Sequence, residues 1–374
     1  MRKIVLFIDS LGAGGAQRQI VNLAVSMAKH NTFLVSVVCY HNSNDFFSKN
    51  LEDAGVSVHF INRSINKSRV FNFVEICLGL YRFFSINRPE LVLSFLPMPS
   101  LYSVIFRYGF GYKLVVGERS SRFAHRSFFR RWIFDIMLLF PNWVVCNSYN
   151  RQSEIKKYLH LSDRVSVIWN GFPIFENSTL INNCFNFKKR SIRLCVVGRI
   201  SKMKNTDTIL RAVDRIAHNT NYSVELVIIG RFDPSFSDFK GNFLELVKAS
   251  PASIHILGEL NDIYPVLSSC DFLIHASLLE GLPNVVCEAM INGTIPIVNP
   301  VFDNTFLVKD AKTGFYCGSS EQDIFECLMR VINYDSVLLQ RVRIDAYNFA
   351  LSSFDIDKRS QEYTDLFFKL LGKK

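Results

Sequence analysis

The chain has 374 residues, a net charge of +10 and a hydrophobic fraction of 49%, with 34 Phe and 13 Tyr. This composition excludes a disordered protein, and the length favours two domains, because single cores rarely grow beyond about 250–300 residues. No apolar run reaches the roughly 18 residues of a membrane-spanning helix, and the N-terminus lacks the cleavage site of a secretory signal. Nine scattered cysteines without a C-x-x-C pair favour reduced thiols. We therefore expect a cytoplasmic protein.

The first segment, KIVLFIDSLGAGGAQR, predicts a strand, a glycine-rich turn and a helix, an order that commonly binds phosphate groups. A dinucleotide-binding fingerprint is nearly present in Gly12, Gly14 and Gly15. However, bulky Gln17 stands where a third small residue should pack, and the second strand ends at Tyr40 without the carboxylate that binds an NAD ribose. The motif predicts a backbone anion site without NAD, or a turn that only reverses the chain.

Positive charge is concentrated in the first half of the chain. Residues 1–180 hold 21 basic and 11 acidic side chains, whereas residues 181–374 hold 22 of each. Within residues 106–132, seven basic side chains are interleaved with eight aromatic ones, and Glu118 is the single acid. Such a segment suits an anionic membrane surface, where rings enter the interface and cations meet phosphates. A solvated face with its aromatics in the core, or a nucleic-acid surface, would have a similar composition.

Both halves of the chain alternate short aliphatic runs with helical patterns, which predicts parallel sheets with crossover helices. The predicted strands are KIVLFI, TFLVSVVCY, VSVHFI, LVLSF, KLVVG, WVVCN and RVSVIWN, then RLCVVG, VELVIIG, SIHILG, DFLIHAS, IPIVN and GFYCG. The polar, Asn-rich residues 170–191 between the two series are typical of a linker. We expect an α/β protein with two doubly wound, Rossmann-like domains, residues 1–175 and 176–358. An amphipathic helix, residues 359–374, packs back on the first domain.

Candidate site residues follow the strands of the second half, because ligands of open α/β sheets bind beyond the carboxyl ends of strands. In VVGRISKMKN, Arg199 leaves a strand and Lys204 lies near a helix start. An Arg fork and a Lys point charge suit a pyrophosphate, although an ordinary solvated loop would also carry them.

The segment HASLLEGLPNVVCEAM carries two carboxylates around a predicted helix start. Glu280 lies in the loop, Pro283 fits the first helical turn, and Glu288 lies about 7 Å further along the helix axis. Backbone N–H groups of residues 281–286 would point at an anion. The segment therefore predicts one carboxylate on each side of a bound phosphate group, unless both only favour the helix dipole.

The motifs GGAQR, WNG (169–171), GRISKMKN, ILG (256–258) and E-x7-E within EGLPNVVCEAM together resemble the family 4 glycosyltransferases over nearly the whole chain. The resemblance implies a GT-B fold, two Rossmann-like domains with an interdomain cleft. It implies retaining transfer of a hexose or N-acetylhexosamine from a nucleotide sugar, commonly a UDP-sugar. It further implies a polyprenyl diphosphate-linked glycan as acceptor, at the inner face of the cytoplasmic membrane, in O-antigen, lipopolysaccharide or capsule synthesis.

The resemblance also assigns the donor site. Glu280 would accept hydroxyl hydrogens of the donor hexose, and Glu288 would bind the ribose hydroxyls. Arg199 and Lys204 would hold the pyrophosphate and stabilise the charge of the leaving nucleotide. Further donor contacts at the helix start would come from Gly281, Leu282, Pro283, Asn284 and Val285.

In the first half, the resemblance implies that the N–H of Gly15, with Gly14 beside it, reaches the distal phosphate. Gln17 replaces the more frequent Glu of GGAER, which should not disable this contact. Many relatives carry a His near the donor sugar after the strand KLVVG; here Glu118 and Arg119 follow, and Arg119 is a possible donor or acceptor contact or a part of the basic segment.

No cofactor or protein-bound metal is implied. The one D-x-D sequence, which a metal-dependent GT-A enzyme would need after a strand, is Asp355-Ile-Asp357 beside the terminal helix, where capping explains it. Two other functions remain open: a GT-B sugar-nucleotide epimerase or hydrolase, which would consume donor without acceptor, and a non-catalytic membrane-docking protein with a degenerate sugar site.

Overall fold

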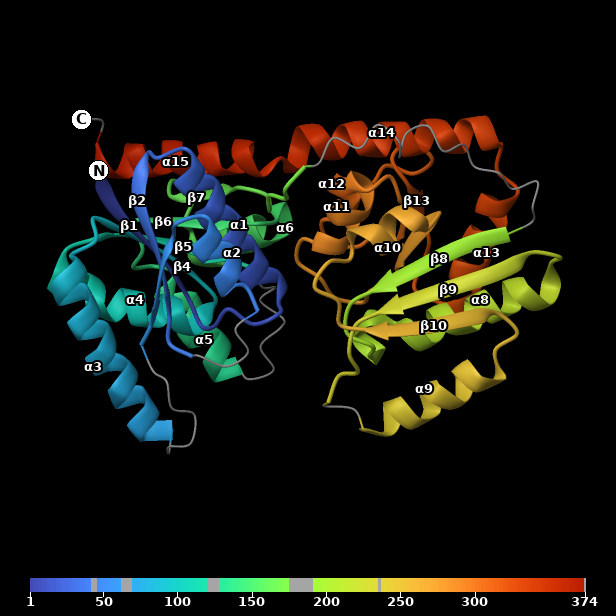
Figure 1. The fold of residues 1–374 in the computed structure, drawn as a ribbon, viewed down its shortest axis with the longest axis horizontal. Coiled ribbons are helices and arrows are strands. Elements are labelled where there is room, and N and C mark those ends of the chain that lie inside the picture. The colour runs from blue at the N-terminus through green and yellow to red at the C-terminus, as the bar shows by residue number, and fades with distance from the viewer. Residues whose placement is uncertain (42–45, 62–68, 120–127, 175–190, 235–236, 373–374) are drawn as a thin grey trace. The chain divides into compact units, whose positions relative to one another are not determined.

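The computed structural model describes residues 1–41, 46–61, 69–119, 128–174, 191–234 and 237–372. They form two compact units: one comprises Met1–Pro173 and Phe354–Lys374, and the other comprises Ile174–Ser353. Each unit is a parallel sheet covered by helices, so the predicted α/β architecture with two Rossmann-like domains is confirmed (Figure 1).

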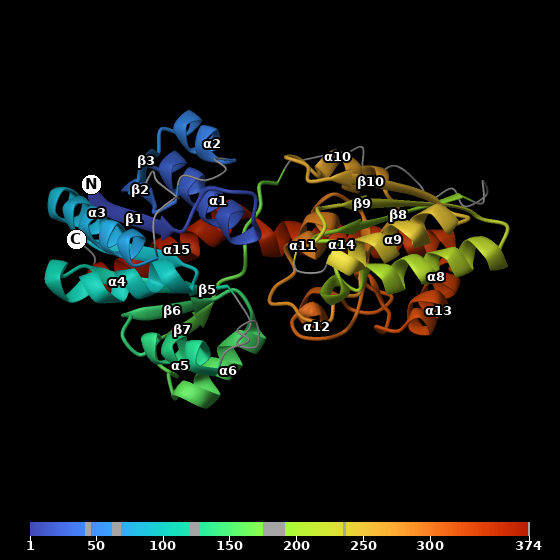
Figure 2. The same cartoon turned by 90° about the horizontal axis from the view of Figure 1, so that it is seen from below.

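The first unit contains a parallel sheet of order β3-β2-β1-β4-β5-β6-β7, which Figure 2 shows from β3 at the top to β7 at the bottom. Every predicted strand of the first series is present, and the central strands β1 and β4 are apolar runs that are buried on both faces. The strands are β1 (Arg2–Ile8), β2 (Phe33–Cys39), β3 (Ser57–Phe60), β4 (Leu91–Phe95), β5 (Lys113–Glu118), β6 (Trp143–Cys146) and β7 (Val165–Val167).

Helices cover both faces of this sheet, since alternate residues of a strand point to opposite sides. In β1, Ile4, Leu6 and Ile8 face α1, α2 and α15, whereas Val5 and Phe7 face α3, α4, α5 and α6. Figure 1 shows α15 on one side of the sheet and α3, α4 and α5 on the other. The helices are α1 (Gly15–Lys29), α2 (Ser48–Asp53), α3 (Arg69–Asn87), α4 (Pro97–Phe110), α5 (Phe128–Met137), α6 (Tyr149–Leu159) and α15 (Ile356–Leu371).

The second unit has the strand order β10-β9-β8-β11-β12-β13, the arrangement of a dinucleotide-binding fold. All predicted strands of the second series are present: β8 (Ser191–Val197), β9 (Ser223–Ile229), β10 (Ser253–Gly258), β11 (Phe272–His275), β12 (Ile295–Val298) and β13 (Phe315–Tyr316). Its helices are the short 3₁₀ helix η3 (Lys202–Lys204), α8 (Thr206–Asn219), α9 (Ser237–Ala249), α10 (Tyr264–Ser269), α11 (Asn284–Ile291), α12 (Asn304–Leu307), α13 (Glu321–Ile332) and α14 (Ser336–Phe354).

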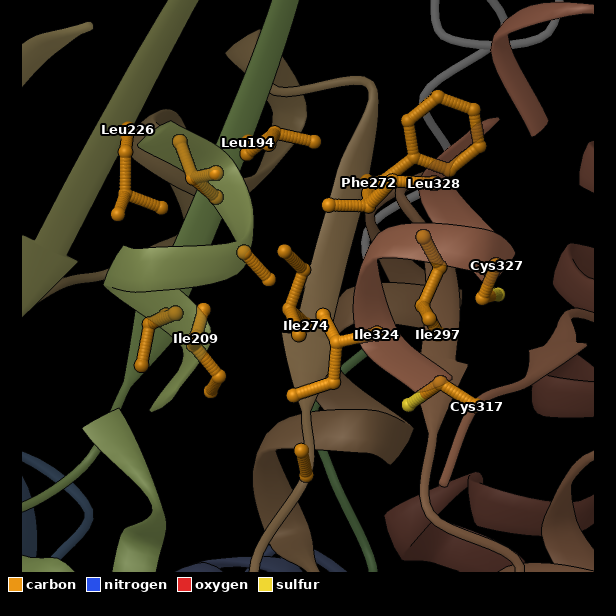
Figure 3. Packing of buried hydrophobic residues seen from close by; sticks show 14 of the residues in the cluster. Leu194, Ile209, Leu226, Phe272, Ile274, Ile297, Cys317, Ile324, Cys327 and Leu328 are labelled. Atoms are coloured by element: carbon orange, nitrogen blue, oxygen red, sulfur yellow. The ribbon is translucent and has the colours of Figure 1, made fainter. Parts of the chain in front are cut away.

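An aliphatic core joins this sheet to α8 and α13. Figure 3 shows strand residues such as Leu194, Leu226 and Ile274 packed against Ile209 of α8 and Ile324 of α13. All five side chains are buried. A core of this density makes the strand ends rigid supports for the loops that follow them.

The C-terminal helix α15 is docked on α1 of the first unit. Asp355 caps α15 by accepting a hydrogen bond from the backbone N–H of Asp357 at 3.0 Å, and the carboxylate of Asp357 accepts hydrogen bonds from Ser26 and Lys29 of α1. Phe367 is fully buried beneath the helix. The D-x-D sequence therefore caps and anchors a helix, as its position predicted.

Candidate functional site

The loops after β8 and β11 lie at the point where the strand order of the second unit reverses. Chain connections leave β8 and β11 toward opposite sides of the sheet, which opens a crevice at the carboxyl ends of these two neighbouring strands. The predicted residues Arg199 and Lys204 follow β8, and Glu280 follows β11. The fold thus brings the two motifs to the place where doubly wound sheets bind ligands.

Hydrogen bonds hold these two loops together. The backbone carbonyl of Met203 accepts hydrogen bonds from the Ser277 hydroxyl at 3.2 Å and from the Leu278 N–H at 3.0 Å. The Lys204 ammonium then donates a hydrogen bond to the Glu280 carboxylate, in an ion pair whose side chains are 25% and 17% exposed. Two predicted site residues that are 76 positions apart are therefore preorganised side by side.

His275, the last residue of β11, is a member of this site that the sequence analysis missed. Its side chain is 5% exposed, and its Nε2 lies 3.5 Å from Oε1 of Glu280. This Nε2 is buried and has no hydrogen-bond partner among the described residues. The sequence could have indicated His275 through its position at a strand end, five residues before Glu280. It was missed because it lies outside the E-x7-E motif.

Burial and charge set the protonation states of this group. Burial, with a smaller contribution from the charge of Lys204, lowers the pKa of His275 to about 4, although the charge of Glu280 opposes the shift. Burial alone would raise the pKa of Glu280, but Lys204, His275 and Ser277 outweigh it, so this pKa lies below its ordinary value. At neutral pH the site therefore presents an ionised carboxylate beside a neutral imidazole.

Arg199 lies at the same edge of the sheet but pairs with a different carboxylate. Its guanidinium lies 3.2 Å from Asp233, which follows β9, and its side chain is 62% exposed. The Asp233 side chain is only 11% exposed. The guanidinium of Arg199 is therefore accessible to a ligand phosphate from the side that faces solvent.

Helix α11 begins beside Glu280, and its first turn has no side-chain cap. Pro283 is the N-cap residue and Asn284 is the first helical residue, so the helix starts one position later than predicted. The first N–H groups of a helix have no partner within it. Here no described side chain caps the helix at Pro283, and the Val286 N–H donates to the Pro283 carbonyl at 3.1 Å. The dipole of the helix favours an anion at this end. Glu288 is buried in the second turn of the helix.

In the first unit, the glycine-rich turn leads directly into α1. Gly14 is the N-cap residue, Gly15 opens the helix, and no side chain caps it. Gln17 folds back over Gly14 and donates a hydrogen bond to Asp9 at 2.9 Å, so a Cβ at position 14 would lie 2.2 Å from the Gln17 amide oxygen. A side chain at position 14 would therefore need the Gln17 amide to turn away from its present position.

Arg119 is engaged within the first unit. Its guanidinium donates hydrogen bonds to Asn170 and, at 2.5 Å, to the hydroxyl of Tyr363, and it lies 4.0 Å from the ring centre of Phe95. Asn170 belongs to the WNG motif, and Tyr363 belongs to α15. These contacts link β5, the end of the first series and the C-terminal helix; a contact of Arg119 with donor or acceptor stays a prediction.

The first unit also contains a largely apolar cavity of about 580 Å³ at the carboxyl edge of its sheet. Its lining comes from the ends of β1, β2 and β4 and from α4 and α5: Asp9, Tyr40, Leu96, Pro97, Met98, Pro99, Leu101, Ile133 and Phe134. Among the described residues of this lining, Asp9 is the one carboxylate, and the Gln17 amide holds it in place. The cavity is large enough for a small organic group such as a sugar.

The basic and aromatic segment 106–132 is described only in part. Residues 120–127, and the side chains of 128–131, lie outside the described residues. In the remainder, Phe106, Phe110 and Tyr112 pack against the core, whereas Tyr108 and Trp132 are more than half exposed. The aromatic side chains of this segment therefore serve both the core and the surface. None of the described helices combines the length and apolar character that a membrane span needs.

Comparisons with known proteins identify the family and the fold of the chain. Residues 13–174 match the family model described as Glycosyltransferase Family 4, and residues 179–347 match the model described as Glycosyl transferases group 1. The chain is 27% identical over 218 residues to the UDP-Gal:alpha-D-GlcNAc-diphosphoundecaprenol alpha-1,3-galactosyltransferase of Escherichia coli, and this match spans only 56% of the length of each chain.

Two further similarities cover more of the chain. A Campylobacter jejuni protein, GalNAc-alpha-(1->4)-GalNAc-alpha-(1->3)-diNAcBac-PP-undecaprenol alpha-1,4-N-acetyl-D-galactosaminyltransferase, is 21% identical over 325 residues, 86% of each chain. The fold matches a crystal structure of Anabaena HepE in complex with UDP-glucose with a TM-score of 0.83 at 17% identity, over 99% of this chain and 100% of that one. With adjoining family models over both units and two Rossmann-like sheets, the chain belongs to the family 4-like glycosyltransferases of GT-B fold.

Proposed function

We propose that this protein transfers a hexose or N-acetylhexosamine from a UDP-sugar to a polyprenyl diphosphate-linked glycan, with retention of the anomeric configuration. The observation that carries the proposal is the Lys204–Glu280 pair at the switch point of the second sheet. The named activities of the Escherichia coli and Campylobacter jejuni relatives support a lipid-linked acceptor, and the UDP-glucose complex of HepE supports a UDP-sugar donor.

The chemistry follows from the charges of the site. A departing nucleoside diphosphate develops negative charge, which fixed cations and helix N-termini stabilise where it forms. The Lys204 ammonium has three donors, so it can bind Glu280 and still donate to the diphosphate. We propose that Arg199 and the first N–H groups of α11 add further donors, and that the N–H of Gly15 binds the distal phosphate.

Glu280 supplies the opposite kind of contact. Its carboxylate is ionised at neutral pH and accepts hydroxyl hydrogens of the hexose, while Glu288 accepts those of the ribose. In this scheme Lys204 and Arg199 stabilise the negative charge of the diphosphate, and the scheme includes no metal ion. We propose that the acceptor saccharide enters the cavity of the first unit, with Asp9 as a hydroxyl acceptor, and that the protein acts in surface polysaccharide synthesis on the inner face of the membrane.

Replacing Glu280 tests this assignment. Glu280→Ala should lower kcat for sugar transfer by about 100-fold, the effect expected when a contact that stabilises the transition state is removed. Transfer is measured with UDP-galactose and UDP-N-acetylgalactosamine as donors, polyprenyl diphosphate-linked N-acetylglucosamine as acceptor, and EDTA throughout; NMR of the product gives the anomeric configuration.

The matched control is Glu326→Ala, which removes an exposed carboxylate from α13 and should leave kcat unchanged. If Glu280→Ala has the same kcat as the wild-type protein, Glu280 does not take part in sugar transfer. Donor consumption without acceptor would identify an epimerase or hydrolase. Absence of nucleotide binding and of turnover in the wild-type protein would favour a non-catalytic docking protein.

A further inference from the structure

Helix α3 is apolar on two opposite faces. One face packs into the core of the first unit through Ile76, Leu80 and Phe84. The other face carries an apolar stripe at helical spacing, in which every side chain is more than a third exposed: Phe71, Val74, Leu78 and Tyr81. A helix that is apolar all round normally has partners on all sides. We therefore expect an apolar partner to cover the outer face of α3.

Helix α4 continues this surface and joins it to the cavity. Met98 and Leu101 line the cavity, and Ile105 and Tyr108 extend the same stripe along the helix, exposed at 50% and 71%. The spacing of three and four residues places these side chains on one side of α4. An apolar path thus runs from the cavity wall along the outside of the helix.

The two helices run beside each other and in the same direction. The rings of Phe73 and Tyr102 lie 5.8 Å apart near the starts of the helices, and those of Tyr81 and Phe110 lie 5.5 Å apart near their ends. Figure 1 shows α3 and α4 together at the outside of the first unit. The two stripes form one surface, here named the apolar α3–α4 face: Phe71, Val74, Leu78, Tyr81, Met98, Leu101, Ile105 and Tyr108.

Charges around this face favour an anionic lipid surface as its occupant. Residues 69–113 carry five basic and two acidic side chains, and Arg82 and Lys113 are exposed. Basic residues beside exposed aromatic and aliphatic ones bind bilayers that contain anionic lipids. A second copy of the chain would bring the same positive rim against itself, which like-charge repulsion opposes.

We propose that the apolar α3–α4 face docks on the surface of a bilayer containing anionic lipids, so that the cavity opens beside the membrane and receives the saccharide end of a lipid-linked acceptor. This inference rests on the proposed function for the acceptor, and on the exposed stripes for the docking surface. The surface differs from the segment 106–132 indicated by the sequence, because of its eight residues only Tyr108 lies in that segment.

Vesicle binding by two matched variants tests the proposal. Leu78→Glu/Ile105→Glu places two charges on the apolar α3–α4 face, at side chains that are 54% and 50% exposed. The control, Val337→Glu/Leu338→Glu, places two charges at side chains of α14 that are 74% and 53% exposed. Partitioning is measured by co-sedimentation with vesicles of phosphatidylethanolamine and phosphatidylglycerol.

We expect the face variant to bind these vesicles about tenfold or more weakly than the wild-type protein, and the control to bind them equally well. The variant should keep the rise in Tm with UDP and the transfer to a short-chain, water-soluble acceptor, while it loses transfer to vesicle-borne acceptor. Equal vesicle binding by variant and wild type would overturn the proposal.

Two other results would also overturn it. A wild-type protein that does not bind the vesicles has no such surface. A wild-type dimer in light scattering that becomes a monomer in the face variant, without vesicle binding, would assign the face to a second copy. If UDP does not raise the Tm of the wild-type protein, the proposed donor is contradicted. The docking surface is then tested by vesicle binding alone.

Discussion

Arg199 is an exposed side chain that a ligand can reach. Its side chain is 62% exposed, and its guanidinium lies 3.2 Å from Asp233. We predict that Arg199→Ala weakens UDP binding by about 1.5–3 kcal/mol, roughly 10- to 150-fold in Kd, because a charged hydrogen bond to the diphosphate is lost. Isothermal titration with UDP measures this change.

Arg231 provides the matched control for this experiment. Its side chain is 61% exposed and lies 3.3 Å from Glu259, much as Arg199 lies beside Asp233. Arg231→Ala should leave the Kd for UDP unchanged. Equal weakening in both variants would indicate a general loss of positive charge at this edge and would contradict a specific contact of Arg199.

Neutral His275 makes a pH-dependent contribution to stability. Its pKa is lowered from 6.5 to about 4 in the folded chain, so the unfolded chain binds more protons between these two values. Stability is therefore lost as the pH falls from about 6.5 to about 4, by up to about 3 kcal/mol at about 1.4 kcal/mol per pKa unit. His275→Gln should remove this part of the acid destabilisation.

Urea unfolding at pH 7.5 and pH 5 measures the difference between the two proteins. His255→Gln is the control, because the side chain of His255 is 49% exposed on β10. This control should keep the pH dependence of the wild-type protein. If His275→Gln also keeps it, His275 is not the neutral, buried group that the structure shows.

At the scale of elements, α15 is held against the first unit by a close approach to the WNG motif. The N–H of Gly171 donates a hydrogen bond to Gln19 of α1, and a Cβ at this position would lie 2.6 Å from Cδ1 and 2.9 Å from Cα of Ile356. The structure therefore explains the glycine of the WNG motif: the loop that contains Gly171 packs closely against α1 and α15.

Gly171→Ala should accordingly lower the free energy of unfolding by about 1–3 kcal/mol, because α15 must move to make room for a methyl group. Gly109→Ala makes the same change in α4, where a Cβ would meet nothing within 4 Å, and should leave stability unchanged or raise it by up to about 1 kcal/mol. Urea denaturation compares both with the wild-type chain. An unchanged midpoint in Gly171→Ala would show that α15 is not tightly docked.

Helix starts differ in a way that matters for anion binding. Ser148, Ser320 and Asp355 cap α6, α13 and α15 with their own side chains. The starts of α1, α8 and α11, which follow the glycine-rich turn and the two site loops, have no such cap, and neither do α2, α4, α10 and α12. Helices that lack a side-chain cap keep N–H donors for a ligand.

For the whole molecule, charge is distributed unevenly along the chain. The net positive charge belongs to the first half of the chain, which carries the apolar α3–α4 face, whereas the second half is neutral overall and carries the Lys204–Glu280 pair. Both proposals fit this distribution, because positive potential attracts an anionic surface, and balanced charge leaves recognition of a nucleotide to individual side chains.

The sequence by itself determined the strands, the doubly wound architecture and most of the donor motifs. Apolar runs such as KIVLFI are buried on both faces, so hydrophobicity alone identifies them, and strand ends direct attention to Arg199, Lys204 and Glu280. These signals are local in the chain, or they repeat at a fixed spacing.

Only the tertiary structure decided which of these residues meet and which surfaces remain open. Lys204 pairs with Glu280 from a distant loop, and His275 is buried beside them. Arg119 likewise donates hydrogen bonds to Asn170 and Tyr363, which lie far from it in the chain. The outer stripe of α3 is apolar like its inner one, so the hydrophobic pattern along the chain does not show which of the two packs against the sheet. Three-dimensional packing makes that choice, because a helix presents only one of its sides to the sheet it covers.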